Sequence, residues 1–163
     1  MKALLLASAS PLAAFIERDV PRPKPEKGEV LIFIHAAGIT PTELAWYPTT
    51  QTRDGGVRTG AVLSHEFAGE IAEVGEGVEN LEVGDSIYGM NDWFAEGALA
   101  EYCITQPGSI APKPEKLHYT EAASVPIGAL TAWQGLFDRA NIGPCRDARS
   151  QIDTFKRFSR RGQ

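Results

Sequence analysis

The stretch that decides the fold is Gly28-Glu-Val-Leu-Ile-Phe-Ile-His-Ala-Ala-Gly38. Along an extended chain it places β-branched and apolar residues on both alternating faces, which is typical of a strand buried on two sides in a barrel or sandwich. Pro41 then opens a short helical turn over residues 41–47, with Thr40 as its N-cap and Glu43 near the positive end of its dipole. We therefore expect a strand over residues 28–38, followed directly by a turn.

More strands are expected on both sides of this one. The proline-rich segment from Pro21 to Pro25 interrupts ladder pairing and predicts an edge loop, and residues 48–60 are expected to form an exposed loop. The remaining expected strands are bounded by Gly, Pro or Ser and cover residues 2–6, 13–18, 67–74, 84–88 and 98–104. These patterns predict a mainly β domain with a few helices.

The pattern becomes helical after Thr120. A helical turn is expected there, and a second helix is expected to begin at Pro126 and to stop near Asn141 and Gly143. Spacings of three and four residues give this helix one apolar stripe, formed by Ile127, Leu130, Trp133 and Phe137. We expect another protein surface to cover the stripe.

Composition limits the class of protein. The chain has 163 residues, 43% of them hydrophobic and 23% charged, which is enough for one folded domain and too few for two of catalytic size. No apolar run approaches the roughly 20 residues of a membrane span, and residues 1–9 lack the apolar region of a signal peptide. Cys103 and Cys145 form no metal or disulfide motif. We expect a cytoplasmic protein that binds no membrane.

Charge divides the chain into two parts. The net charge is −5, but residues 1–145 carry 10 basic and 19 acidic side chains, whereas residues 146–163 carry 6 and 2. An acidic body argues against nucleic-acid binding, which needs a basic surface. We therefore expect one domain over residues 1–143 and a divergent, unstructured basic tail over residues 144–163.

Taken in order, several short motifs resemble the N-terminal GroES-like domain of the medium-chain dehydrogenase/reductase superfamily, in particular its zinc-independent quinone oxidoreductase branch. They are Pro-Lys-Pro-Glu-Lys-Gly-Glu-Val-Leu-Ile (23–32), Ala-Ala-Gly-Ile-Thr-Pro-Thr-Glu-Leu (36–44), Ser-His-Glu-Phe-Ala-Gly-Glu-Ile (64–71), Val-Gly-Glu-Gly-Val (74–78), Val-Gly-Asp (83–85) and Gly-Ala-Leu-Thr-Ala-Trp (128–133). The resemblance covers about residues 1–143 and implies a partly open β-barrel.

The resemblance also implies an activity, which is hydride transfer from NADPH to a quinone or an enone. Relatives bind the cofactor in a Rossmann domain that follows the position of Gly143, through a Gly-x-Gly-x-x-Gly turn at a helix start. No such turn follows Gly143 here, and Gly75 and Gly77 are better interpreted as a β-turn. We expect a chain cut short by truncation or a frameshift, and weak or inactive by itself.

A zinc ion is not expected. Zinc-dependent relatives have a cysteine just after the first strand's glycine, where this chain has Ile39 and Thr40, although His65 and Glu66 match the next pair of the family pattern. A catalytic zinc needs three protein ligands, and the sequence offers at most two. We expect His65 to be a hydrogen-bonded structural residue and His35 to be a core residue with its polar atoms satisfied.

Three residues are candidates for the site. The resemblance places Thr40 and Tyr47 near the nicotinamide, as hydrogen-bond donors to the substrate oxygen and as cofactor contacts, and it places Thr131 against the cofactor. Simpler interpretations stay open, because Thr40 can cap a helix, Tyr47 can pack its ring, and Thr131 can bond back within its helix.

An alternative function comes from the apolar stripe. Burying large side chains such as Trp133 and Phe137 contributes several kcal/mol, at ~25 cal/mol per Å² over ~150 to 250 Å² each. The chain could thus be a non-catalytic module that self-associates, or binds a partner, through Leu130, Trp133 and Phe137.

Overall fold

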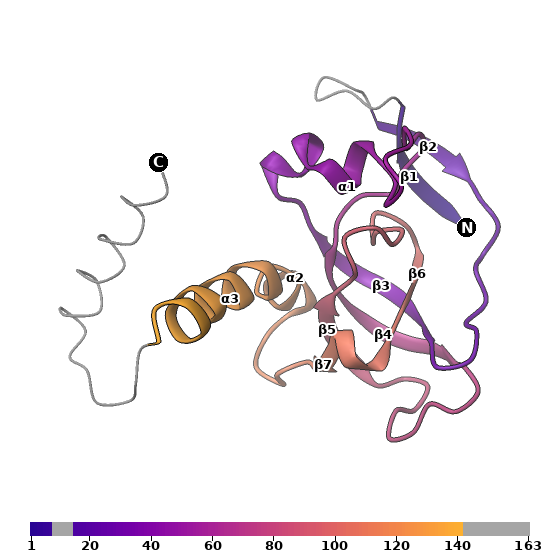
Figure 1. Cartoon of the computed structure of the whole chain (residues 1–163). Coiled ribbons are helices and arrows are strands. Elements are labelled where there is room, and N and C mark those ends of the chain that lie inside the picture. Colours follow the sequence, from indigo (N-terminus) through magenta and orange to yellow (C-terminus); the bar gives the residue numbers. More distant parts are fainter. Residues whose placement is uncertain (8–14, 142–163) are drawn as a thin grey trace. The chain divides into compact units, whose positions relative to one another are not determined.

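Two antiparallel sheets organise the first part of the chain (Figure 1). In the computed structural model, residues 1–7 and 15–141 are described, and Met1–Pro126 form one unit, after which a second begins at Ile127. The smaller sheet pairs β1 (Lys2–Leu6) with β2 (Phe15–Asp19). The larger sheet has the order β6-β3-β4-β5-β7 and contains β3 (Val30–Gly38), β4 (Glu66–Val74), β5 (Ser86–Met90), β6 (Tyr102–Thr105) and β7 (Ile110–Pro112).

The strand expected over residues 28–38 is confirmed as β3, which pairs with both β4 and β6. Val30, Leu31 and Ile32 are all buried, as a strand covered on both faces requires, whereas the later part of β3 is only half-buried or exposed. The register with β4 shifts between Leu31 and Ile32 and again between Ile34 and Ala36, which marks two irregularities of the β-bulge kind. The mainly β fold with an unclosed sheet is also confirmed.

The main core lies against this sheet. Its buried members come from four strands and from the segment that follows β5, and they are Val30, Ile32, Phe67, Ile71, Ile87, Ala98 and Cys103. A smaller cluster forms where α2 (Tyr119–Ala123) packs Ala122 and Ala123 on Ala68 of β4. α2 is the helical turn expected at Thr120, and it packs against β3 and β4, the central strands of the larger sheet (Figure 1).

The segment between β3 and β4 differs from the sequence expectation. Instead of one turn over 41–47, it forms a 3₁₀ helix, η1 (Pro41–Ala45), and a separate turn of α-helix, α1 (Tyr47–Thr50). Thr40 holds the N-cap position of η1, but its side chain makes no capping hydrogen bond. The expected exposed loop after residue 47 is wrong at Thr49, which is buried and donates from Oγ1 to the carbonyl of Glu43 at 2.6 Å.

A few further elements complete the described chain. η2 (Pro107–Ser109) and the short strand β7 after it carry no clear sequence signal and were not expected. Residues 13 and 14 of the expected second strand, the stop at Gly143 and the basic tail all lie outside the described residues. Within the described residues, no helix combines the length and apolar character that a bilayer crossing needs.

The second unit contains the helix expected from Pro126. It is α3 (Pro126–Trp133), and a six-residue π-helix, η3 (Gln134–Arg139), continues from it. The rings of Trp133 and Phe137 are in contact, with centroids 4.4 Å apart. Asn141 has φ +49°, a left-handed conformation that suits the expected helix stop.

Gly69 of β4 provides a test of the close contact between the central strands. A Cβ at this position would lie 2.1 Å from the carbonyl oxygen of Phe33 on β3. We predict that Gly69→Ala lowers the free energy of unfolding in urea by about 2–3 kcal/mol, because the backbone must shift. Gly108→Ala is the matched control, since a Cβ there meets nothing within 4 Å. Equal stability of the two variants would contradict this packing.

Candidate functional site

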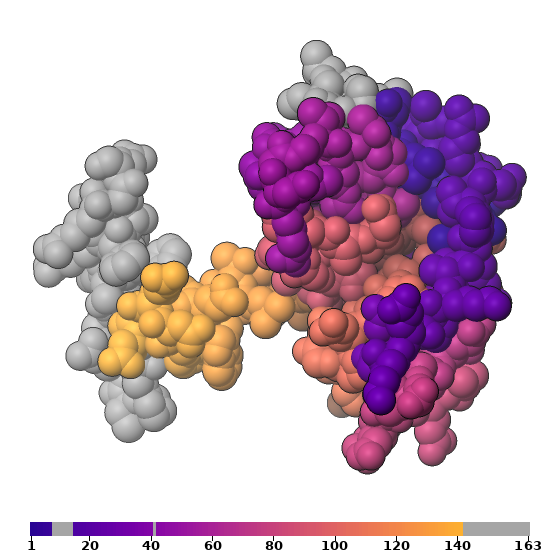
Figure 2. Space-filling view, turned by 45° about the vertical axis from the view of Figure 1, so that its right-hand side comes forward, coloured from indigo at the N-terminus to yellow at the C-terminus, as the bar shows by residue number. Residues whose placement is uncertain are grey.

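Two loops meet around His65, which lies just before β4. The first loop contains η1 and α1 and contributes Glu43, Trp46 and Tyr47, and the second follows β5 and contributes Trp93. Figure 2 shows the purple segment with η1 and α1 lying against the salmon segment that follows β5. The strand ends thus bring together residues that are far apart in the sequence.

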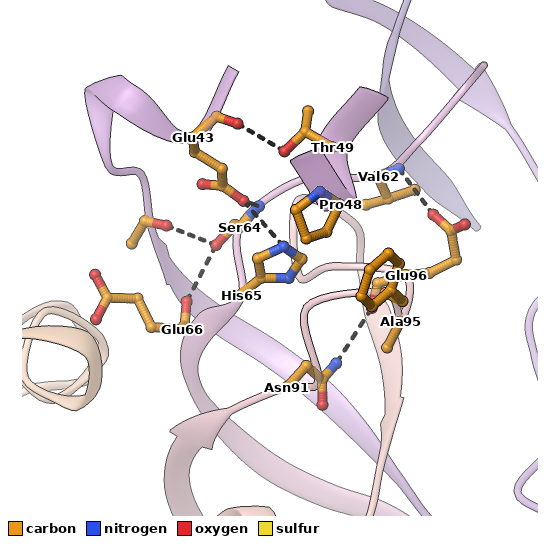
Figure 3. Close-up of polar contacts among 12 residues, drawn as sticks. Glu43, Pro48, Thr49, Val62, Ser64, His65, Glu66, Asn91, Ala95 and Glu96 are labelled. Atoms are coloured by element: carbon orange, nitrogen blue, oxygen red, sulfur yellow. Dashed lines mark hydrogen bonds and ion pairs between the residues drawn. The ribbon is translucent and has the colours of Figure 1, made fainter. Parts of the chain in front are cut away.

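Glu43 and His65 form a buried pair at the centre of this cluster (Figure 3). Each is only 1% exposed, and Nε2 of His65 lies 3.7 Å from Oε1 of Glu43. The same Oε1 accepts a 2.8 Å hydrogen bond from the backbone N–H of Ser64. Ser64 has a left-handed φ of +70°, and its hydroxyl donates to the carbonyl of Gly38 at 2.7 Å. The end of β3 and the start of β4 are therefore joined through Ser64.

Burial shifts the pKa of both members of the pair. Burial, together with the smaller effect of the nearby Arg58 cation, lowers the pKa of His65 to about 4. Burial also raises the pKa of Glu43, although backbone hydrogen bonds from Ser64 and Thr40 oppose the rise by stabilising the carboxylate. His65 is consequently neutral at pH 7, with one nitrogen that donates and one that accepts.

Several buried atoms of the pair lack a hydrogen-bond partner. Among the residues that the structure describes, Oε2 of Glu43 and both ring nitrogens of His65 are without one. A buried polar atom without a partner costs about 1–3 kcal/mol, so such atoms are rare and need an explanation. The sequence expectation that His65 is hydrogen-bonded is therefore not met among these residues, because the acceptor that faces its ring, Oε1 of Glu43, lies 3.7 Å from Nε2, beyond hydrogen-bond distance.

The rings of two tryptophans lie beside His65. The Trp46 ring is nearly parallel to the His65 ring, at an interplanar angle of 10° and a centroid distance of 6.5 Å. The Trp93 ring stands perpendicular to both, at 87°, with centroids 5.0 Å from Trp46 and 5.2 Å from His65. Two indole rings therefore border His65, one nearly parallel to the imidazole and one perpendicular to it.

Arg58 fastens the two loops to each other. Its guanidinium donates to the carbonyl of Pro48 at 3.0 Å, to the carbonyl of Ala95 at 2.9 Å and to the carboxylate of Glu96 at 2.9 Å. Glu96 also accepts a 2.8 Å hydrogen bond from the backbone N–H of Val62. The Arg58 side chain is only 10% exposed, so these charge-assisted bonds are partly shielded from water. They fix the position of the aromatic residues that the loops carry.

The three predicted site residues lie in different parts of the chain. Thr40 is half-buried and directly precedes η1. Tyr47 is the first residue of α1 and is 49% exposed, and its ring packs edge-on against the ring of Phe94, with centroids 6.2 Å apart. Thr40 and Tyr47 thus flank η1. Thr131 is an exposed residue of α3 in the second unit.

Sequence reasoning missed the partners of His65 and misplaced His35. Glu43 was noted only for the helix dipole, and no periodic pattern marks Trp46 or Trp93. The expectation of a buried His35 is wrong: its side chain is about one-third exposed, with Nε2 3.4 Å from Glu70 and its ring stacked on Tyr119 at 4.3 Å. After Ile32 only one face of β3 stays against the core, where Ile34 packs, and His35 lies on the opposite, exposed face with Phe33.

Neither a zinc ion nor a dinucleotide fits the described residues. In residues 1–7 and 15–141 no three His, Cys, Asp or Glu side chains are grouped as metal ligands, and His65 has only Glu43 facing its ring nitrogen. All strand pairings in the same ranges are antiparallel, whereas a dinucleotide pyrophosphate is held by a parallel βαβ unit.

The loop after β5 also borders a separate cleft of about 840 Å³ between β1 and β6. The residues that line it include Leu5, Val62, Phe94 and Thr105. Neither Tyr47 nor His65 lines this cleft, so it is distinct from the cluster around His65.

Comparisons with known proteins agree with this fold. Residues 26–115 match the family profile of the alcohol dehydrogenase GroES-like domain. The chain is 32% identical over 142 residues to the mitochondrial NAD(P)H oxidoreductase RTN4IP1 of Dictyostelium discoideum, covering 85% of this chain and 40% of that protein. It is 30% identical over 149 residues to the chloroplast envelope quinone oxidoreductase homolog of Arabidopsis thaliana, covering 87% of this chain and 44% of that protein.

A solved structure shows the same relationship. The quinone oxidoreductase of Coxiella burnetii superposes with a TM-score of 0.72 at 28% identity, over 87% of this chain and 45% of that one. The chain therefore spans less than half the length of these relatives.

The buried His65 predicts a loss of stability in acid. Its folded pKa of about 4 lies below the ordinary 6.5, so from pH 6.5 down to 4 the unfolded chain binds a proton that the folded chain does not. We predict a loss from this residue of about 3 kcal/mol across that window. The raised pKa of Glu43 works in the opposite direction and makes the net loss smaller.

Urea unfolding at pH 7, 6, 5 and 4 measures this loss. His65→Phe keeps a flat ring that cannot titrate, and it should flatten the fall in stability with decreasing pH; only the slopes are compared. Thr120→Ala, at an exposed position and without a titratable group, is the control and should leave the slope unchanged. An identical slope in His65→Phe and the unaltered chain would show that His65 is not the residue responsible.

Proposed function

Because the chain belongs to the family of alcohol dehydrogenase GroES-like domains, within the medium-chain dehydrogenase/reductase superfamily, we propose that it is the substrate-side domain of a zinc-independent, NADPH-dependent oxidoreductase that reduces quinones or enones. The names of two relatives support this proposal, since one is an NAD(P)H oxidoreductase and the other a quinone oxidoreductase homolog. The chain would provide the surface on which the substrate carbonyl rests.

One observation carries the proposal, and it is the anchoring of the loop that bears Thr40 and Tyr47. The backbone N–H of Glu43 donates to the carbonyl of Thr40 at 2.9 Å, the Glu43 side chain is buried, and the N–H of Trp46, next to Tyr47, donates to the Glu43 carbonyl at 3.1 Å. Donor hydroxyls held in place cost little reorganisation when charge develops on a substrate oxygen. They therefore stabilise the transition state more than the ground state.

The roles of these residues follow from the chemistry of conjugated carbonyls. Reduction of a quinone or an enone places negative charge on the carbonyl oxygen, and the hydroxyls of Thr40 and Tyr47 donate hydrogen bonds to that oxygen. NADPH supplies the hydride when it is bound, and Thr131 is proposed to contact it. Since the described residues provide no cradle for its pyrophosphate, we expect this chain alone to be weakly active or inactive.

Location and partners follow the sequence expectations. We propose a cytoplasmic protein that acts on a small molecule and binds neither nucleic acid nor membrane. The cytoplasmic location stays a prediction, because one relative carries a mitochondrial name and another a chloroplast name.

Substitution of the two donors tests the proposed activity. In the chain joined to the nucleotide-binding domain of a relative, Thr40→Val and Tyr47→Phe each remove one hydroxyl with little change of shape. We predict that each lowers kcat/KM for quinone reduction about 10- to 100-fold, the cost of one charge-assisted hydrogen bond. NADPH oxidation at 340 nm measures the rate. Thr42→Val, at an exposed neighbouring position, is the control, and unchanged rates in all variants would remove both residues from the site.

A second candidate function is favoured by the exposure of the apolar stripe on α3 and η3. Leu130, Trp133 and Phe137 are 44%, 59% and 42% exposed in the described structure. Large apolar side chains grouped on one helical surface are typical of a contact with another protein. We propose that, when no other domain covers it, this stripe binds a second copy of the chain.

Leu130→Asp tests that association. A charge in the middle of the stripe should move the mass measured by light scattering from that of an oligomer to that of a monomer at the same concentration, because burying an unpaired carboxylate is costly. Thr131→Asp places the same charge on the neighbouring exposed residue and is the control. An oligomer that survives Leu130→Asp would exclude the stripe as the interface.

A further inference from the structure

The cleft between β1 and β6 follows the edge of a strand. Residues 100 and 102–106 all line it, and they belong to β6 or directly flank it. The side chains of a strand alternate between its two faces, so consecutive residues line one cleft when the cleft runs along the edge of the strand. At about 3.3 Å per residue, this stretch makes the cleft about 20 Å long. That length, with a volume of about 840 Å³, suits an elongated small molecule.

The lining of the cleft is mostly apolar. Its apolar members come from β1, from the segment between β2 and β3, from β6 and from the loop after β5, and they include Leu5, Pro21, Pro23, Phe94 and Ile104. Backbone hydrogen bonds hold the segments in place, since the N–H of Leu4 donates to the carbonyl of Leu99 at 2.8 Å, and that of Gly97 to the carbonyl of Val62 at 2.9 Å. A preformed apolar cleft favours a ligand with a long apolar body.

One polar side chain of the lining is buried without a partner. Thr105, the last residue of β6, is 4% exposed, and its Oγ1 has no hydrogen bond within the described part of the chain. The amide of Asn91, which also lines the cleft, is by contrast paired, because it donates to the carbonyls of Glu96 and Ile104 at 3.2 Å each. A hydroxyl both donates and accepts. A ligand that brought a hydrogen-bonding group to Oγ1 would therefore satisfy a group that folding leaves unpaired.

The charges around the cleft disfavour an acidic ligand. Among the described residues that line it, Arg53 is the only basic side chain, whereas three side chains are acidic, namely Glu29, Asp92 and Glu96. Arg53 is already paired with the carboxylate of Asp92, and the ammonium group of Met1 donates to the carbonyl of Val20 at 2.8 Å. A carboxylate or phosphate head would lose its hydration here without gaining an unengaged cation, which is unfavourable. The head of the ligand is thus expected to be uncharged.

We propose that the cleft between β1 and β6 binds a neutral, elongated amphiphile, a molecule with an alkyl or isoprenoid chain and one uncharged hydrogen-bonding head. The chain lies along β6 against the apolar lining, and the head pairs with the hydroxyl of Thr105. Because this cleft is separate from the cluster around His65, the inference goes beyond the proposed reductase and does not depend on it.

Calorimetric titration of the purified chain at pH 7 tests the proposed ligand class. The probe is octanamide, and octanoate has the same chain with a charged head. We expect saturable binding of octanamide to one site, and binding of octanoate that is weaker by about tenfold or more, because its charge is desolvated without a partner. Hexanamide should bind about tenfold more weakly than octanamide, since two methylene groups no longer bury apolar surface.

Thr105→Val tests the hydroxyl, because it keeps the shape of the side chain and removes only the polar atom. It should weaken octanamide binding about 3- to 10-fold, the loss of one hydrogen bond, and it should also raise the urea midpoint of the free chain, because an unpaired buried hydroxyl is gone. A purely structural role of Thr105 would not move affinity and stability in opposite directions. Thr105→Ser keeps the hydroxyl and should change the affinity no more than about twofold.

Occlusion of the cleft is the second test. Ala100 lines the cleft, and Ala100→Leu places a larger side chain in it, which should weaken octanamide binding about tenfold or more. Octanamide binding that survives this change in full would place the ligand elsewhere and overturn the proposal. It is also wrong if octanamide shows no saturable binding, if octanoate binds as tightly, or if Thr105→Val leaves the affinity unchanged.

Discussion

The structure around the candidate site depends on one constraint, the anchoring of Glu43 by backbone hydrogen bonds. The N–H of Ser64, just before β4, donates to its carboxylate at 2.8 Å, and its own N–H donates to the carbonyl of Thr40, just after β3, at 2.9 Å. A carboxylate that is 1% exposed is costly unless such donors compensate its lost hydration. The loop between β3 and β4 must therefore fold back so that Glu43 reaches the junction of the two central strands, and the position of everything else in that loop follows.

This constraint connects the sheet to the aromatic cluster. Once Glu43 is in place, the Trp46 ring lies nearly parallel to the His65 ring, and Tyr47 begins α1 at the surface. Arg58 then fixes this loop to the one after β5, which brings Trp93 against both rings. The outcome combines a well-paired framework with a histidine that lacks partners among the described residues. Buried polar atoms without partners are rare in folded proteins, and these set His65 apart from the paired residues around it.

The sequence predicted the strands of the fold more completely than it predicted the contacts of the candidate site. Strands rich in β-branched residues, such as β3 and β4, were located to within two residues, because burial of their apolar faces is encoded locally. The order of motifs also placed Thr40 and Tyr47 on one loop. The pairing of Glu43 with His65 was not foreseen, since the two residues are 22 positions apart and only the return of the chain through β4 joins them.

The sequence by itself therefore determined the class of the domain, its family and the identity of its main strands, because these depend on periodicity and on motifs that are contiguous along the chain. Only the tertiary structure decided which polar side chains are buried away from solvent and which aromatic rings are in contact. His35 and His65 illustrate the difference: both follow apolar segments, yet one is one-third exposed beside Glu70 and the other is enclosed by two tryptophans. Enclosure depends on what folds over a residue from elsewhere in the chain, and no local pattern records that.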